Sequence, residues 1–87
     1  MGIPVRLTIL SREDCHHCEA VHRIALSLQS ELSVETNIVD VDGDNTLRER
    51  YGTRVPVVLL NDIEHFSGDV TEEELRRAIK KRGGEDR

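Results

Sequence analysis

A short apolar run leads into a pair of cysteines, and the pair leads into a helical pattern. The run is Val5–Leu10, whose partly β-branched composition predicts a buried strand. After a polar loop comes Cys15-His16-His17-Cys18, and from Cys18 apolar residues recur every three or four positions as far as Leu32. That spacing forms one face of a helix. The chain is therefore expected to place both cysteines in the first turn of a helix that directly follows a strand.

This placement gives the two cysteines a chemical meaning. They are the only cysteines in the chain. The thiolate is the reactive form of cysteine, and a helix N-terminus stabilises it through unpaired backbone N–H groups and the helix dipole. Cys15 lies off the apolar face of the helix, whereas Cys18 lies on it. The pattern predicts a dithiol/disulfide redox centre in which Cys15 is the exposed nucleophile and Cys18 resolves the mixed disulfide.

The rest of the chain alternates strands and helices in a single domain, 1–87. Further strands are expected at 34–41, 55–60 and 63–66, and helices at 46–51 and 71–82. The first half is a βαβ unit with parallel strands, and the second half contains a hairpin. These elements predict an α/β fold of order βαβαββα, with a four-stranded mixed sheet flanked by helices on both faces. We expect 83–87 to be a frayed tail.

Charge and composition exclude several classes of function. The formal net charge is −5 and there is no basic stripe, which argues against nucleic-acid and anionic-membrane binding. No apolar stretch reaches the length of a membrane span, and no secretory leader is recognised. Two cysteines so close in sequence would be a poor staple for a secreted mini-protein. We therefore expect a cytoplasmic protein that acts as a monomer.

The element order, with Cys-x-x-Cys between the first strand and the first helix, resembles the thioredoxin fold in its compact glutaredoxin form. Val55-Pro56 stands at the start of the expected third strand, where that superfamily carries a cis-proline. Small bacterial glutaredoxin-like proteins also share short stretches with this chain. The matching positions are Ser11, Arg12, Cys15, His16, Cys18, Val39 to Asp42, Tyr51, Gly52 and Val55 to Val57.

The resemblance implies a small thiol–disulfide oxidoreductase or electron carrier that reduces protein disulfides. No bound cofactor is implied. Either a flavin-dependent reductase or glutathione would serve as the electron donor. The resemblance also implies that the Val55-Pro56 bond is cis, and that the backbone of Val55 pairs with the bound substrate beside the dithiol.

The sequence departs from glutaredoxins where they hold the γ-glutamyl end of glutathione. Their Gly-Gly followed by acids is reduced here to Ser67-Gly68-Asp69. Asp69 remains a candidate for binding a substrate ammonium group, and Arg12 or Arg54 for binding a carboxylate. Each of the three has the alternative of being a solvated surface charge.

The histidines between the cysteines have two interpretations. His16 is expected to be an exposed residue of the first helical turn. His17 directly precedes Cys18, and a protonated imidazole there would stabilise the Cys15 thiolate and the reduced form. We therefore assign His17 a tuning role, with a solvated surface position as the alternative.

A second class of function stays open at this point. Cys15, Cys18 and His22, with His16 or His17, are potential metal ligands, although all lie within eight residues and no second cluster exists. We therefore predict no metal site. The alternative to the oxidoreductase is a metal-binding or protein-interaction module on a thioredoxin scaffold.

Overall fold

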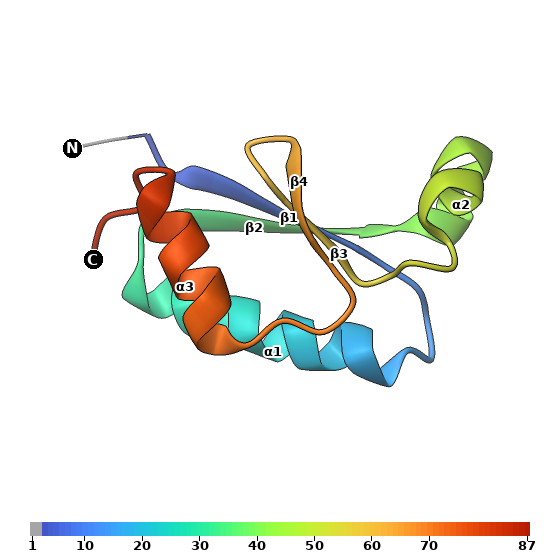
Figure 1. Cartoon of the computed structure of the whole chain (residues 1–87), viewed down its shortest axis with the longest axis horizontal. Coiled ribbons are helices and arrows are strands. Elements are labelled where there is room, and N and C mark those ends of the chain that lie inside the picture. The colour runs from blue at the N-terminus through green and yellow to red at the C-terminus, as the bar shows by residue number, and fades with distance from the viewer. Residues whose placement is uncertain (1–2) are drawn as a thin grey trace.

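Strands and helices occur in the predicted order in the computed structural model, which describes residues 3–87 (Figure 1). The elements are β1 (Val5–Ser11), α1 (His16–Glu31), β2 (Val34–Asp40), the one-turn 3-10 helix η1 (Val41–Gly43), α2 (Asn45–Tyr51), β3 (Val57–Leu60), β4 (Ile63–Ser67) and α3 (Glu72–Lys81). No helix in this part of the chain is long and apolar enough to cross a membrane.

The four strands form one mixed sheet of order β2-β1-β3-β4. β1 and β2 are parallel because α1 carries the chain back between them, and β1 pairs with β3 in the antiparallel sense. Asn61 and Asp62 both have positive φ, of 51° and 69°, as a tight two-residue hairpin turn between β3 and β4 requires. The four-stranded mixed sheet predicted from the sequence is confirmed.

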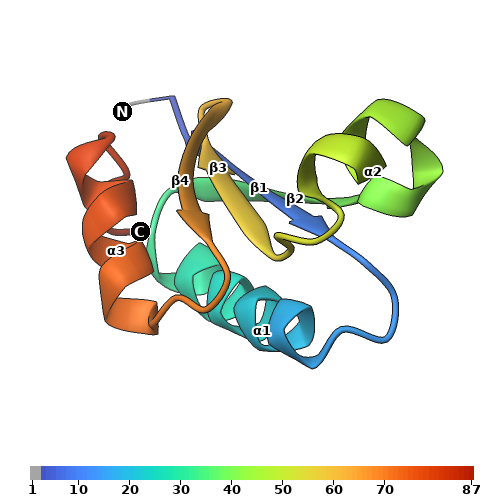
Figure 2. The same ribbon diagram turned by 45° about the vertical axis from the view of Figure 1, so that its right-hand side comes forward.

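The sheet has one fully covered face and one partly covered face. α1 and α3 pack on the first face. α2 packs on the second face, at one end of the sheet (Figure 2). The main core on the first face contains alternate residues of the central strands, such as Leu7, Ile9 and Leu60, all fully buried. A smaller cluster around Leu10 and Val57 lies under α2. Helices therefore flank both faces, as the sequence predicted.

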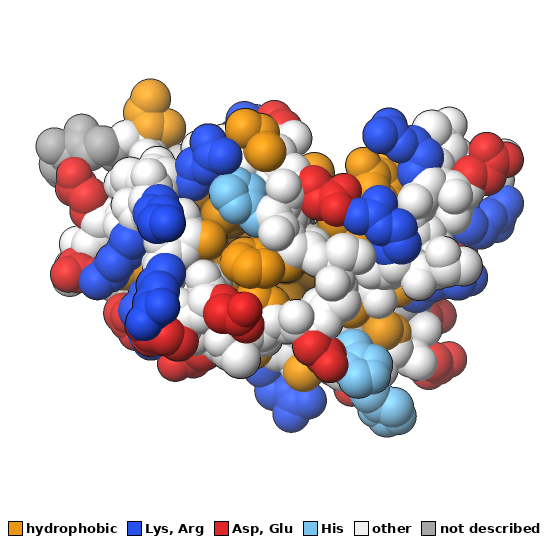
Figure 3. All heavy atoms as spheres, viewed as in Figure 1, with side chains coloured by type: hydrophobic (Ala, Val, Ile, Leu, Met, Phe, Trp, Pro, Cys, Tyr) orange, Lys and Arg blue, Asp and Glu red, His pale blue; other side chains and the backbone are white. Residues whose placement is uncertain are grey.

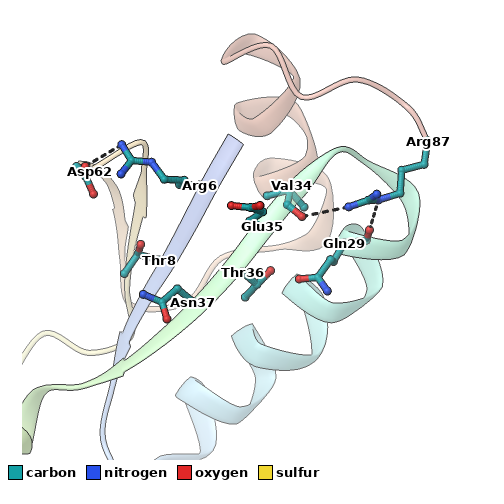
Figure 4. A pocket seen from close by; sticks show the side chains of 9 residues that line it. All are labelled: Arg6, Thr8, Gln29, Val34, Glu35, Thr36, Asn37, Asp62 and Arg87. Carbon is teal, nitrogen blue, oxygen red and sulfur yellow. Dashed lines mark hydrogen bonds and ion pairs between the residues drawn. The ribbon is translucent and has the colours of Figure 1, made fainter. Parts of the chain in front are cut away.

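Away from α2 the second face of the sheet is open and polar. Arg6 and Thr8 of β1 lie beside Asn37 of β2 on this face (Figure 4). Arg6 forms an ion pair of 2.8 Å with Asp62 in the β3–β4 turn. Because these side chains are polar, this half of the sheet can face solvent without a covering helix.

On the first face, a hollow lies between β4 and α3. Phe66, Ala78, Arg77 and Lys81 are among the residues that line it. Figure 3 shows hydrophobic side chains at the bottom of this hollow. The hollow lies along the edge of the main core, against which Phe66 and Ala78 pack.

The prediction of a frayed tail over 83–87 is wrong. Gly84 is buried, and Ser33 donates its backbone N–H to the Glu85 carbonyl at 2.7 Å. The Arg87 guanidinium donates to the carbonyls of Gln29 and Leu32, among others, at 2.6 and 2.8 Å. The Gln29 carbonyl lies in the last turn of α1, and the Leu32 carbonyl belongs to the residue after the helix. Carbonyls at a helix C-terminus have no N–H partner within the helix. The tail therefore caps α1, a role that local sequence does not reveal.

Two element boundaries also differ from the prediction. The second strand ends at Asp40 because Val41 turns into η1, where its side chain is fully buried in the smaller cluster. The third strand begins at Val57 rather than Val55. Pro56 has no N–H to donate to a sheet ladder, so the two residues before β3 form a separate loop.

Candidate redox site

Cys15 is the N-cap residue of α1. Its backbone is extended, its carbonyl accepts the Glu19 N–H at 3.0 Å, and its Sγ accepts the Cys18 N–H at 3.2 Å. Asp14 before it has a φ of 55°, a left-handed conformation that aspartate tolerates better than most residues and that turns the loop into the helix. The sulfur of Cys15 therefore occupies the position where a helix stabilises negative charge.

Cys15 and Cys18 are joined as a disulfide, with their Cα atoms 5.2 Å apart. Cys15 is half-buried, whereas Cys18 is 1% exposed and packs on the apolar face of α1. One sulfur thus lies at the surface and the other beneath it. This is the arrangement that the helical spacing of the sequence predicted.

The loop before β3 lies across a surface cleft from Cys15. The Val55-Pro56 peptide bond is cis, as the resemblance implied. Val55 is half-buried and lines the cleft together with Cys15, His17 and Gly52. Among residues 3–87, the Val55 N–H and C=O make no hydrogen bond, although the neighbouring Pro56 carbonyl accepts from Gly68 at 2.8 Å. A free backbone donor and acceptor therefore border the dithiol.

The His17 ring contacts an acidic residue that is 52 positions away in the sequence. Its Nδ1 lies 2.7 Å from Oδ1 of Asp69, in the loop between β4 and α3. Both side chains are largely exposed, at 70% and 77%. When Nδ1 donates to Asp69, Nε2 is the remaining ring nitrogen that can take up a proton. His16 is 99% exposed at its side chain and is 4.0 Å from Glu19.

Arg12 also lines the cleft and binds two groups of the protein itself. Its Nε and Nη2 each lie 3.0 Å from one oxygen of Asp42, which is a bidentate pair. Its Nη1 donates to the Gly52 carbonyl at 3.2 Å. The hydrogen bond and charge of Asp42 raise the pKa of the Arg12 guanidinium. Arg12 thus ties the loop before α1 to η1 and to the end of α2.

Arg54 has its contacts outside the dithiol cleft. It forms an ion pair with Glu64 of β4, and its guanidinium lies 5.5 Å from the centre of the Tyr51 ring. It is not among the residues that line the cleft beside Cys15. Asp69 is not among them either, and reaches the cleft through His17.

Asp42, which the sequence did not predict as a site residue, binds Arg12 in the wall of the cleft. The available signal was its place in the Val-Asp-Val-Asp stretch that the chain shares with small glutaredoxin-like proteins. In residues 3–87, no group of three or more His, Cys, Asp or Glu side chains is arranged to hold a metal ion.

With this sheet order, a dithiol at the start of α1 facing a proline loop is the arrangement of a small protein of the thioredoxin superfamily. The family model of the glutaredoxin-like domain (DUF836) matches residues 6–80. The chain therefore belongs to this glutaredoxin-like family.

Individual relatives support the same assignment. A Mycobacterium tuberculosis protein described as uncharacterized is 37% identical over 79 residues, which span 85% of this chain and 81% of that protein. A thioredoxin of Methanocaldococcus jannaschii is 31% identical over 81 residues, spanning 90% of this chain and 95% of that protein.

Solved structures agree on the fold. A Nitrosomonas europaea protein solved by solution NMR has a TM-score of 0.77 and 26% identity, with 91% of this chain and 95% of that chain covered. A mutant thioredoxin from Halobacterium salinarum has a TM-score of 0.72 and 23% identity, with 88% of this chain and 73% of that chain covered. The predicted thioredoxin-like fold is confirmed.

Proposed function

We propose that this protein is a small dithiol thiol–disulfide oxidoreductase, or an electron carrier of the same chemistry. The observation that carries the proposal is the unequal setting of its two sulfurs. Cys15 caps α1 at the edge of a cleft and accepts the Cys18 N–H, while Cys18 is buried beside it. A surface thiolate with a shielded second thiol in reach is what a two-step exchange requires.

In the first step the reduced protein attacks a substrate disulfide. The Cys15 thiolate forms a bond to one substrate sulfur, the substrate S–S bond breaks, and the other substrate sulfur leaves as a thiolate that takes up a proton. The Cys18 N–H that now contacts Cys15 Sγ at 3.2 Å would donate to the thiolate before attack. The product of this step is a mixed disulfide between Cys15 and the substrate.

In the second step Cys18 releases the substrate. Its thiolate attacks Cys15 Sγ, the Cys15–Cys18 disulfide forms, and the second substrate sulfur leaves and is protonated. Two electrons and two protons have then passed from the protein dithiol to the substrate. The reverse sequence, with a flavin-dependent reductase or glutathione as donor, regenerates the reduced protein.

Val55 would hold the substrate during both steps. Its N–H and C=O are free within residues 3–87 and border the cleft that contains Cys15. A substrate segment in extended conformation could pair with them as a short strand. We place this activity in the cytoplasm, where thiols are kept reduced and a dithiol pair is more commonly catalytic than structural.

The different roles of the two cysteines can be tested with single Cys→Ser variants. The reduced protein should reduce a disulfide-bonded protein such as insulin, and Cys15→Ser should abolish the reaction. Cys18→Ser should instead accumulate a mixed disulfide at Cys15, visible by mass spectrometry under non-reducing conditions. Full multiple-turnover activity of Cys18→Ser on protein disulfides would rule out the dithiol mechanism.

The electron donor can be assigned in the same assay. Turnover is compared with thioredoxin reductase plus NADPH and with glutathione plus glutathione reductase, at equal protein concentration. A protein reduced by neither donor, and unreactive when reduced chemically, would instead favour a binding module on this scaffold.

A further inference from the structure

We infer that the dithiol cleft takes its disulfide from a polypeptide with basic residues near the cysteine, and that it discriminates against glutathione. The inference rests on the proposed function and names its substrate class. It comes from the partners of the charged side chains around Cys15.

Each candidate residue for binding glutathione already has an ionic or hydrogen-bonding partner in the protein. Both oxygens of Asp42 are within 3.0 Å of the Arg12 guanidinium. The Asp69 carboxylate is bound to His17 at 2.7 Å. Arg54 is paired with Glu64, outside the cleft. To bind a substrate carboxylate or ammonium, any of these residues would first have to give up a bond that it already makes.

Glutathione depends on such charges more than a polypeptide does. It is a tripeptide with two carboxylates and one ammonium group. Besides the sulfur, these charged groups are the main features by which a protein can recognise it. A polypeptide segment has a continuous backbone that can pair with the free N–H and C=O of Val55. It therefore needs no dedicated anion or cation site to be positioned over Cys15.

The charges that remain near the cleft are acidic. Besides Arg12 and its partner Asp42, the cleft and the groove that adjoins it are lined by four carboxylates and three histidines, with no further lysine or arginine. Glu13 and Asp14, directly before Cys15, are exposed and have no cationic partner among residues 3–87. Their field repels a ligand with excess carboxylates and attracts basic side chains of a partner.

The test measures a single turnover, so that it depends on no electron donor. Reduced protein is mixed at low salt with one of three disulfides: a cyclic peptide with lysines beside its cysteines, the same peptide with glutamates there, or glutathione disulfide. The chain has no tryptophan, so its fluorescence cannot report the redox state of the dithiol. The reaction is therefore quenched with acid, and the remaining thiols are alkylated and counted by mass spectrometry. Each rate is divided by that of the same disulfide with dithiothreitol, which removes differences in intrinsic reactivity.

The lysine peptide should react faster than the glutamate peptide, by up to about fivefold for each exposed charge pair. Glutathione disulfide should be slower than the lysine peptide by a larger factor. Added salt should narrow the difference between the two peptides, because exposed charges are screened.

A matched pair of variants tests the paired arginine. Asp42→Asn removes the charge that neutralises Arg12, and should increase the normalised rate with glutathione disulfide severalfold. Asp62→Asn makes the same chemical change at the Arg6 ion pair on the open face of the sheet, away from the cleft, and should leave that rate unchanged.

The outcomes separate the inference from the proposed function. If glutathione disulfide reacts as fast as the lysine peptide, or if the two peptides react equally, the inference is overturned while the oxidoreductase stands. If Asp62→Asn accelerates glutathione disulfide as much as Asp42→Asn does, the role of Arg12 is overturned. If none of the disulfides oxidises the protein, the proposed function itself fails.

Discussion

The two sulfurs of the dithiol differ in their access to solvent and in their place in α1. Cys15 is half-buried at the N-cap, whereas Cys18 is 1% exposed. In the reduced protein, brief treatment with iodoacetamide near neutral pH should therefore label Cys15 several times faster than Cys18. Peptide mapping by mass spectrometry gives both rates. Faster labelling of Cys18 would reverse the assignment of nucleophile and resolving thiol.

His17 and Asp69 should change the reduction potential in opposite directions. A protonated His17 would stabilise the Cys15 thiolate, so His17→Leu should shift the potential to a more negative value. Asp69→Asn removes a negative charge and should shift it to a less negative value. Each shift should be about 30 mV or less, since 30 mV corresponds to about 1.4 kcal/mol and exposed pairs contribute only about 1 kcal/mol.

The measurement is equilibration of wild type and variants in a glutathione redox buffer at one fixed pH. His16→Leu is the matched control, because His16 is adjacent in sequence but its nearest acid, Glu19, lies 4.0 Å away. An equal shift in His16→Leu would mean that nonspecific charge near the helix, rather than the pair with Asp69, sets the potential.

At the residue scale, the sequence predicted the placement of the two cysteines but not the side-chain pairs around them. The apolar spacing of α1 identified which cysteine is buried, because helical periodicity is a local property. Asp42 and Asp69 are 30 and 52 residues from the side chains that they bind. Such pairs are made by the packing of distant loops, so nothing in the local pattern indicated that Arg12 and Asp69 already had partners.

At the scale of elements, α3 has a complete capping box that local sequence does predict. The Thr71 hydroxyl accepts the Glu74 N–H at 3.1 Å, and the Glu74 carboxylate accepts the Thr71 N–H at 2.9 Å. Thr71→Ala should lower the free energy of unfolding by about 1 kcal/mol. Chemical denaturation measures the change, and Thr53→Ala, at an exposed turn threonine, is the control.

The same box should make stability depend on pH. The backbone hydrogen bond from Thr71, and then its side chain, lower the pKa of Glu74 in the folded protein. A lowered folded pKa contributes stability above the unfolded pKa, about 4.3, and the contribution is lost as the pH falls through the folded value. Glu74→Gln should therefore be less stable than the wild type at pH 7, and the difference should shrink in acid. A constant difference down to low pH would contradict this coupling.

The order and type of the elements followed from periodicity and turn residues, whereas two connections did not. The strand expected to reach Val41 ends at Asp40, because Val41 begins η1 and is buried in the smaller cluster. The start of β3 shifted to Val57 because Pro56 cannot join the ladder. In both cases tertiary packing decides the boundary, which local propensity cannot do.

For the molecule as a whole, the C-terminal segment is part of the folded structure. Gly84 is buried, and a Cβ at that position would lie 3.0 Å from the Ile79 carbonyl oxygen and still closer to its Cγ2. Gly84→Ala should therefore lower the free energy of unfolding by roughly 1–3 kcal/mol through overpacking. Gly43→Ala is the control, because a Cβ there meets no atom within 4 Å. Equal stability of the two variants would mean that the segment does not pack as described.

The unequal cores of the two sheet faces have a consequence for how rigid the dithiol cleft is. The cluster under α2 has three buried members, against thirteen in the main core, and α2 itself has no buried residue. Segments with few buried contacts open locally at low free energy. The wall of the cleft that contains Asp42 and Gly52 is anchored to this thin cluster, whereas Cys18 is anchored on the main-core face of α1. The side of the cleft that contains Asp42 and Gly52 can therefore change its conformation to fit partners of different shape, while the positions of the two sulfurs stay fixed.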